Sequence, residues 1–378
     1  MDLDLAPEDA ALRAGARAWL AAHVPPGPLP SLETAAGFAA HRAWERTLHE
    51  AGWSVVSWPQ EYGGRGCSLL QWLVFEEEYW AAGAPARVSQ NGTQLLAPTL
   101  FAHGTPAQRA RILPAMASGE VVWAQAWSEP EAGSDLASLR SAAVRTDGGW
   151  LLRGHKTWSS RAAFADRAFG LFRSHPRAGR PHEGLTYLLF PLRAPGVTVR
   201  PVGRLDGRPA FAEIFLDDVF VPDEDVVGEP GQGWRVAMST AGHERGLMLR
   251  SPGRFGAAAR RLAALWRARG GDPALRERVA DALIRARAYQ LYGYAQASRP
   301  PSAPGAQASL TKVFWSELDL ALHETALDLL GPEGEVAGQP WAEGWLFALA
   351  GPIYAGTNEI QRDVIAERLL GLPKGRRG

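Results

Sequence analysis

Two short segments of the sequence combine tryptophan rings with small hydroxyl side chains. Residues 127–135 read WSEPEAGSD, and residues 154–160 read GHKTWSS. Indole rings offer flat surfaces, while hydroxyls and backbone amides offer hydrogen bonds at a ring edge, so the combination suits a planar heterocyclic ligand. Each tryptophan or serine by itself is typical of a core position or a turn. Their joint spacing favours a binding site.

A glutamate and a helix start add two further kinds of chemistry. Glu244 precedes Arg245 in the segment GHERG, and a carboxylate acts well as a general base when burial raises its pKa toward neutrality. Near the C-terminus, residues 354–362 read YAGTNEIQR, where Thr357 can cap a helix whose apolar face includes Ile360 and Val364. Such a helix start favours an anion such as a pyrophosphate.

Three blocks of elements must position these residues. The hydrophobic pattern predicts helices first, then short strands with a period of two, then long helices again. Helices are expected near 7–20, 38–51, 68–82, 105–117, 232–267, 273–298, 305–330 and 358–370, and strands near 121–127, 142–145, 150–153, 168–173, 186–190, 197–202 and 211–216. Asp217 and Asp218, which compete weakly with Glu244 as a base, are expected in a β-turn.

Composition excludes several classes of function. Forty basic and forty acidic residues give no net charge, which argues against a nucleic-acid binder. The single cysteine, Cys67, allows no intramolecular disulfide, and the histidine spacing predicts no metal site. The first residues carry no basic segment before an apolar run, and no window reaches about 18 apolar residues. We therefore expect a cytoplasmic protein without membrane spans.

These motifs, in this order, resemble those of the acyl-CoA dehydrogenase family. The likeness also includes residues 206–222 and Gly233-Trp234, and it extends over nearly the whole chain. It implies an α+β multidomain fold: an N-terminal α-helical domain (1–119), a middle β-barrel-like domain (120–228) and a C-terminal four-helix bundle (229–378). It also implies an FAD cofactor and an acyl-CoA or acyl carrier protein thioester as substrate.

The resemblance also assigns roles to single residues. Trp127 and Ser128 would bond the pyrimidine edge of the flavin, Trp158 would pack against its ring, and the Ser160 hydroxyl would reach N5. Ser134 would lie near the substrate's pantetheine or the cofactor phosphates. Thr357 and Glu359 would contact the ADP portion of FAD.

The family pattern is broken at the usual catalytic base. Many members carry a glutamate directly before the Gly-Thr of the C-terminal motif, but this chain has Ala355 there. A second base position known in the family, just before an arginine, corresponds to Glu244, with Arg245 beside it. The backbone N–H of Ala355 would still bind the thioester oxygen. The small side chain at this position makes branched or bulky acyl groups the expected substrates.

The segments that bind the ADP half of FAD in family tetramers also differ. Residues 267–271 read RARGG and residues 328–334 read DLLGPEG, so Asp328 and Pro332 replace a glutamine and a glycine. A poorly solvated aspartate would repel a pyrophosphate. FAD binding is therefore expected to be altered, or to depend on a different partner chain.

Three functions are consistent with these residues. The first is an FAD-dependent acyl-CoA dehydrogenase of lipid metabolism, such as fatty acid β-oxidation, that passes electrons to an electron-transfer flavoprotein. The second is a non-catalytic or half-site subunit of a heteromeric acyl-CoA dehydrogenase complex. The third is a flavin oxidase or monooxygenase of the same fold. A homo-oligomer or a heteromeric tetramer built through the C-terminal bundle is expected in the first two cases.

Overall fold

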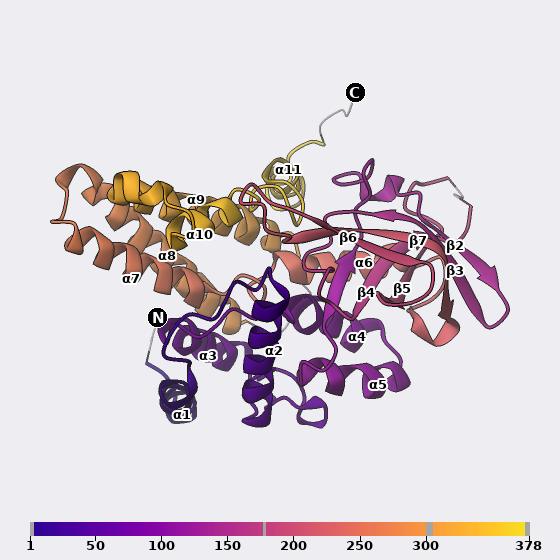
Figure 1. The fold of residues 1–378 in the computed structure, drawn as a ribbon, viewed down its shortest axis with the longest axis horizontal. Helices are drawn as coiled ribbons and strands as arrows, with labels where there is room; N and C mark the ends of the chain where they lie inside the picture. The colour runs from indigo at the N-terminus through magenta and orange to yellow at the C-terminus, as the bar shows by residue number, and fades with distance from the viewer. Residues whose placement is uncertain (1–3, 177–178, 300–304, 375–378) are drawn as a thin grey trace. The chain divides into compact units, whose positions relative to one another are not determined.

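The computed structural model describes residues 4–176, 179–299 and 305–374 (Figure 1). Helices come first, then a sheet, then helices again, so the predicted fold class is confirmed. Each of two compact units is assembled from separated stretches of chain. They comprise Met1–Pro26, Cys67–Ala84 and Arg245–Gly378 (unit 1), and Gly27–Gly66 and Pro85–Glu244 (unit 2). The domain boundaries expected at 119/120 and 228/229 stay a prediction.

Unit 1 is helical. Its α7, α8 and α9 lie side by side as a bundle (Figure 1), and α3 packs on α7. At that contact Gly253 approaches the backbone of Glu76 so closely that a Cβ would lie 2.7 Å from its carbonyl oxygen. The α-helices are α1 (Pro7–His23), α3 (Leu69–Ala81), α7 (Pro252–Ala268), α8 (Arg276–Ala297), α9 (Gln307–Leu330), α10 (Pro340–Ala348) and α11 (Asn358–Arg368).

The single helix expected over 232–267 is two helices. The first, α6 (Gly233–Arg245), ends at the arginine of the Glu-Arg pair, and α7 begins only at Pro252. Proline lacks an N–H and keeps the preceding residue out of the helical region, so it suits the first position of a helix and not its interior. Ser251 caps α7 by accepting a hydrogen bond from Gly253 N. The prediction of one continuous helix was wrong because it overlooked this proline.

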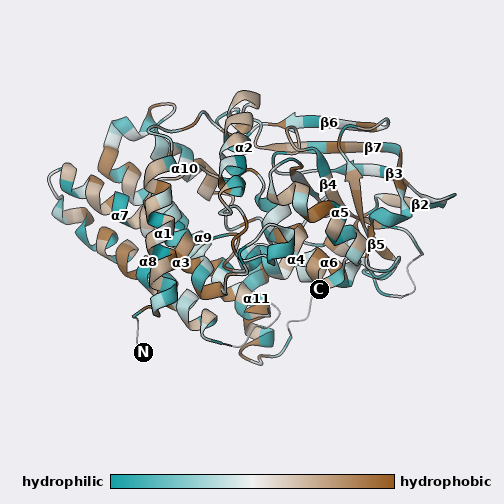
Figure 2. Cartoon of the chain, turned by 90° about the horizontal axis from the view of Figure 1, so that it is seen from below, coloured by the Kyte–Doolittle hydropathy of each residue, from teal (hydrophilic) through white to brown (hydrophobic). Residues whose placement is uncertain are grey.

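Unit 2 is built around a sheet with strand order β6-β7-β3-β2-β4-β5-β8, and β1 pairs with β4 in parallel. The strands are β1 (Trp123–Ala126), β2 (Ala142–Thr146), β3 (Gly149–Lys156), β4 (Arg167–Arg173), β5 (Leu185–Pro191), β6 (Val197–Val202), β7 (Phe211–Pro222) and β8 (Val226–Val227). Six consecutive residues of β5 are buried, and their side chains are mostly hydrophobic (Figure 2). Both faces of this strand are therefore covered, whereas β6 at the edge alternates between half-buried and exposed residues.

The two aspartates expected in a turn lie within a strand. Asp217 and Asp218 are part of β7, where pairing with β3 shifts register between Leu152 and Gly154. Asp218 has a left-handed backbone, with φ of 51°, at this irregularity, and its carboxylate pairs with Arg153 of β3. A bulge thus replaces the predicted turn.

Unit 2 also contains α2 (Ala35–Glu50), a π-helical segment (Asn91–Leu96), α4 (Ala97–His103), α5 (Pro106–Ala117) and α6 up to Glu244. Gln108 fixes α5 to the sheet, because its Nε2 donates to the carbonyls of Glu224 (2.8 Å) and Val226 (2.6 Å). Its Oε1 accepts from the N–H of Thr105 and completes a capping box at the start of α5. Among the described residues, no helix is both long enough and apolar enough to span a membrane.

A buried polar cluster joins three residues of the unit 1 bundle. Arg254 on α7 donates to both carboxylate oxygens of Asp319 on α9 (2.9 and 3.2 Å), and His323 Nδ1 lies 2.7 Å from the Asp319 carbonyl oxygen. Burial lowers the pKa of His323, Asp319 opposes this, and Arg254 adds to the lowering. In unit 2, burial and the nearby His103 likewise lower the pKa of His243.

The lowered pKa values of these two histidines predict that the folded protein is less stable in acid. Because their folded-state pKa lies below the unfolded value of about 6.5, the unfolded chain binds more protons as the pH falls through that value. The stability linked to the neutral form of these histidines should therefore be fully present above about pH 6.5. The free energy of unfolding should decrease below that pH. Urea unfolding at pH 7.5 and 5.5 would measure the difference, which should shrink in His323→Gln. The matched control is His23→Gln, because His23 is exposed; an equal change in both variants would contradict the assignment.

Candidate functional site

A buried lysine ties together the two segments predicted to bind the flavin. Lys156, at the end of β3, has no exposed surface, and its Nζ donates to Trp127 O (3.2 Å), Glu129 Oε1 (2.8 Å) and Leu171 O (2.8 Å). Burial lowers the pKa of Lys156 to about 8, against the attraction of Glu129. Burial by itself would raise the pKa of Glu129, but Lys156 holds it below its usual value. The pair therefore anchors the 127–129 backbone to the sheet.

The second segment continues directly from this lysine. Thr157 N donates to Ser128 O (2.9 Å), which joins the two segments, and Ser159 exchanges two backbone hydrogen bonds of 3.0 Å with Ala212 on β7. Between them Trp158 takes a left-handed backbone conformation, with φ of 59°. Its side chain is 61% exposed, and its ring meets Phe211 edge-on at 5.8 Å. A strained backbone that presents a large aromatic ring outward suits a residue that covers a flat ligand.

Two buried polar atoms of these segments lack a hydrogen-bond partner among the described residues. They are the Trp127 indole Nε1 and the Ser159 hydroxyl. Ser128 and Ser160 are half-buried, and Ser134 is exposed in the turn after the Glu129–Ala132 bridge. Because buried donors rarely stay unpaired in native proteins, the unpaired atoms indicate a ligand with polar edges.

Glu244 lies near the end of α6, in unit 2 with these segments. Burial raises the pKa of Tyr187 on β5, and the charge of Glu244 raises it further. The Tyr187 ring in turn meets Trp127 edge-on, with centroids 6.4 Å apart, and its hydroxyl lies 3.4 Å from Thr240 Oγ1. Tyr187 thus links the predicted base to one of the predicted flavin contacts.

The remaining predicted residues lie in unit 1: Arg245 at the end of α6, Ala355 and Thr357 before α11, and Glu359 in the first turn of α11. Ala355 has φ of 59°, and its carbonyl accepts from Arg245 Nε at 3.1 Å. Thr357 caps α11 by accepting from Ile360 N at 3.3 Å. The exposed Glu359 has its pKa lowered by its own backbone N–H and by the Thr357 hydroxyl. The turn therefore combines a capped helix start with a strained backbone.

The acidic residues at the altered ADP segments have basic partners. Asp328 pairs with Arg278, and Glu333 accepts from Arg269 Nη1 at 3.0 Å. Arg269 lowers the pKa of Glu333. The repulsion expected from Asp328 is therefore offset by an arginine of the same chain.

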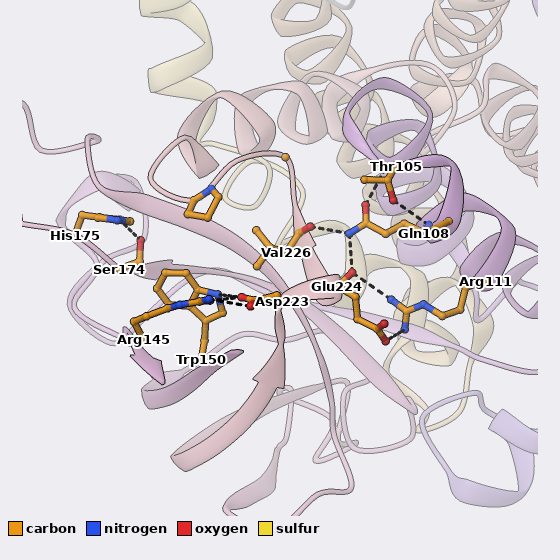
Figure 3. Close-up of a pocket in the computed structure, with 13 residues that line it drawn as sticks. Thr105, Gln108, Arg111, Arg145, Trp150, Ser174, His175, Asp223, Glu224 and Val226 are labelled. Atoms are coloured by element: carbon orange, nitrogen blue, oxygen red, sulfur yellow. Dashed lines mark hydrogen bonds and ion pairs between the residues drawn. The ribbon is translucent and has the colours of Figure 1, made fainter. Parts of the chain in front are cut away.

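A cavity of about 800 Å³ lies elsewhere in unit 2, at one end of the sheet (Figure 3). Its charged residues are paired, Arg145 with Asp223 and Arg111 with Glu224. None of the predicted site residues is among those that line it, which are Thr105, Ala107, Gln108, Arg111, Arg145, Trp150, Ser174, His175, Asp223, Glu224, Val226, Gly228 and Pro230. The cavity is therefore not the predicted flavin site.

Comparison with known families decides the identity of the fold. The N-terminal, middle and C-terminal domain profiles of acyl-CoA dehydrogenase match residues 6–120, 124–219 and 231–370. The chain belongs to the acyl-CoA dehydrogenase family. As a member of this family it is an oxidoreductase, and its cofactor is FAD.

Several relatives match this acyl-CoA dehydrogenase over its full length. Acyl-CoA dehydrogenase IpdE1 of Mycobacterium tuberculosis (strain ATCC 25618 / H37Rv) is 40% identical over 387 residues, or 97% of this chain and 98% of that protein. The structure of the ChsE4-ChsE5 complex from Mycobacterium tuberculosis aligns with a TM-score of 0.86, at 29% identity and full coverage of both chains. The Tcur3481-Tcur3483 steroid ACAD aligns with a TM-score of 0.84, at 28% identity, covering 99% of this chain and all of that one.

The residues of unit 2 fit FAD. The unpaired indole N–H of Trp127 and the unpaired Ser159 hydroxyl suit the polar edges of a flavin, and the exposed ring of Trp158 suits its face. Reasoning from the sequence missed Lys156, although lysine scarcity was a usable signal. The sequence holds only three lysines, and two of them, Lys156 and Lys312, are completely buried.

Proposed function

We propose that this chain catalyses α,β-dehydrogenation of a bulky acyl-CoA thioester, with Glu244 as the base. Glu244 takes the α-proton, the β-carbon gives up a hydride, and the product is the trans-2-enoyl thioester. FAD, when bound, supplies the two-electron acceptor for this hydride. The electrons pass on to an electron-transfer flavoprotein.

The observation that carries the proposal is the position of Glu244 on α6, the helix whose Thr240 Oγ1 lies 3.4 Å from the hydroxyl of Tyr187, the ring that meets Trp127 edge-on. A carboxylate whose charge acts on a residue packed against a predicted flavin contact is suitably placed to serve as a base. We assign the pyrimidine edge of the flavin to Trp127 and Ser128, its face to Trp158 and its N5 to Ser160. Ser134 is assigned to the pantetheine or the cofactor phosphates.

The proposed contacts to the thioester oxygen and to the ADP portion of FAD lie around the start of α11. The backbone N–H of Ala355 donates to the oxygen and stabilises the enolate that forms when the α-proton leaves. Arg245 holds the Ala355 carbonyl, and Thr357 and Glu359 contact the ADP portion. Alanine at position 355 and the resemblance to a steroid ACAD support a branched or polycyclic acyl group, such as a steroid-derived one.

Anaerobic titration of the purified, FAD-reconstituted chain tests the reaction. The absorbance of oxidised flavin near 450 nm is followed while straight-chain, α-branched and polycyclic acyl-CoA thioesters are added. We expect bleaching with the bulky thioesters and little with the straight-chain ones. Comparable bleaching by all three classes would contradict the substrate assignment. Peroxide produced in stoichiometric amounts under air would favour an oxidase.

A second candidate is a half-site subunit of a heteromeric complex. Both solved relatives described above are two-protein assemblies, and the 267–271 and 328–334 segments depart from the family pattern. Native mass and the flavin content of the chain purified alone distinguish the two candidates. A chain that retains no FAD alone but gains it with a co-expressed partner would support the heteromeric one.

A further inference from the structure

Side chains hold the backbone turn at Ala355 in one particular conformation. Ala355 and Gly356 both have left-handed backbones, with φ of 59° and 81°. A non-glycine residue in this region is strained, because its Cβ comes too close to the following carbonyl oxygen. Such strain persists only where neighbouring groups fix the conformation, and it often marks a functional position.

A buried glutamine helps to hold the Ala355 turn in this conformation. Gln361, on the first turn of α11, has no exposed surface, and its Nε2 donates to Ala355 O at 3.4 Å. Arg245 Nε donates to the same carbonyl at 3.1 Å. Two donors on one carbonyl set the orientation of the peptide plane that follows Ala355. A Cβ on Gly356 would lie 2.3 Å from Gln361 Nε2, so the turn accepts only glycine there.

Side chains of helix α9 hold Gln361 in place. Ser309 Oγ donates to Gln361 Oε1 at 2.8 Å, which leaves the amide nitrogen facing Ala355. One turn further along α9, the buried Lys312 donates to Asn358 Oδ1 at 2.7 Å, and Ser316 donates to the same oxygen at 3.1 Å. Asn358 is 3% exposed. Both ends of the turn are therefore tied to one long helix by buried polar contacts.

We propose that Gln361, oriented by Ser309, is a positioning residue that keeps Ala355 in its left-handed conformation, in which the preceding peptide plane presents the Ala355 N–H to the thioester oxygen. The inference rests on the proposed function, in which that N–H stabilises the enolate. Gln361 touches neither substrate nor cofactor in this role. It acts through the Ala355 carbonyl, so its loss weakens α-proton acidification and leaves thioester binding nearly intact.

The test compares Gln361→Met and Gln361→Glu with the parent protein. Methionine keeps the size of the side chain but removes the donor. An ionised glutamate still accepts from Ser309 but cannot donate to a carbonyl. The full chain is reconstituted with FAD, and the exchange of the thioester α-proton for deuterium in heavy water is followed by mass spectrometry, beside kcat and KM.

We expect both variants to lower α-proton exchange and kcat together, by roughly 10- to 100-fold, since removing an oxyanion donor outright costs about 10²–10³. KM should change by less than about threefold, because ground-state binding is untouched. Exchange at the parent rate in Gln361→Met would overturn the inference. A parent that neither exchanges the proton nor turns over would instead overturn the proposed function.

Ser309→Ala is the milder variant, in case the glutamine substitutions do not fold. It leaves the amide donor in place but removes its tether, so a smaller drop in exchange of the same kind is expected. Thr325→Val is the matched control. Thr325 is a buried hydroxyl on the same helix that donates to Ala321 O (2.7 Å) and does not contact the turn. Equal effects of the α9 variants on exchange would show a general loss of packing and overturn the inference.

Discussion

Glu244→Gln should lose α,β-dehydrogenation while it keeps FAD. Glutamine preserves the size of the side chain but cannot take a proton, and a general base contributes about 10²–10⁴-fold to a rate. We expect a decrease in kcat of this size. Stopped-flow bleaching of the flavin near 450 nm by a reactive acyl-CoA thioester measures it.

Two controls separate a lost base from a disturbed fold. The flavin content and unfolding midpoint of Glu244→Gln should equal those of the parent. Asp217→Asn changes the competing carboxylate, which is exposed on β7, and it should keep the parent rate. Parent-like bleaching by Glu244→Gln would show that the base lies elsewhere.

Lys156→Met should strongly destabilise unit 2. It leaves the Glu129 carboxylate buried without its cation and removes the donor to two backbone carbonyls. Breaking a buried ion pair from one side costs about 3–5 kcal/mol. Because the pair anchors the 127–129 backbone, FAD affinity should fall as well. Urea unfolding and equilibrium dialysis of FAD measure the two effects.

The same strand offers a matched control for this substitution. Arg153, also on β3, pairs with Asp218 at the surface, where both side chains are about half exposed. Exposed pairs contribute about 0–1 kcal/mol, so Arg153→Met should change the free energy of unfolding little. If the two variants lost similar stability, the burial of Lys156 would not be the cause.

The sequence predicted most of the fold because periodicity is a local property. The short β-rich run that predicted a strand at 168–173 corresponds to β4, and the apolar spacing at 273–298 corresponds to α8. It did not predict α10, whose residues Pro340–Ala348 are apolar almost all round and so show no helical stripe. Nor did it predict the parallel pairing of β1 with β4, because that register joins residues far apart in the chain.

The candidate site was predictable to the extent that its residues lie in linear motifs. Trp158 and Glu244 were identified by motif resemblance, and the strain at Ala355 was not, because a backbone angle is absent from a sequence. The Lys156–Glu129 pair depends on how β3 meets the 127–129 segment, and the contact of Gln361 with Ala355 depends on the backbone conformation of the turn between them. The scarcity of lysine was the one sign of the Lys156–Glu129 pair in the sequence, and no sequence pattern indicated the contact of Gln361 with Ala355.

The discontinuity of unit 1 has a consequence for the order in which the chain is made. Arg13 on α1 and Tyr294 on α8 share the carboxylate of Glu77 on α3, and Tyr294 lies 217 residues after Glu77. About 170 residues separate the end of α3 from the start of α7, and synthesis at 5–20 residues per second takes roughly 10–35 s to add them. During that interval the apolar faces of α1 and α3 have no bundle to pack against. Met1–Pro26 and Cys67–Ala84 can therefore join Arg245–Gly378 in unit 1 only after the sheet of unit 2 has left the ribosome.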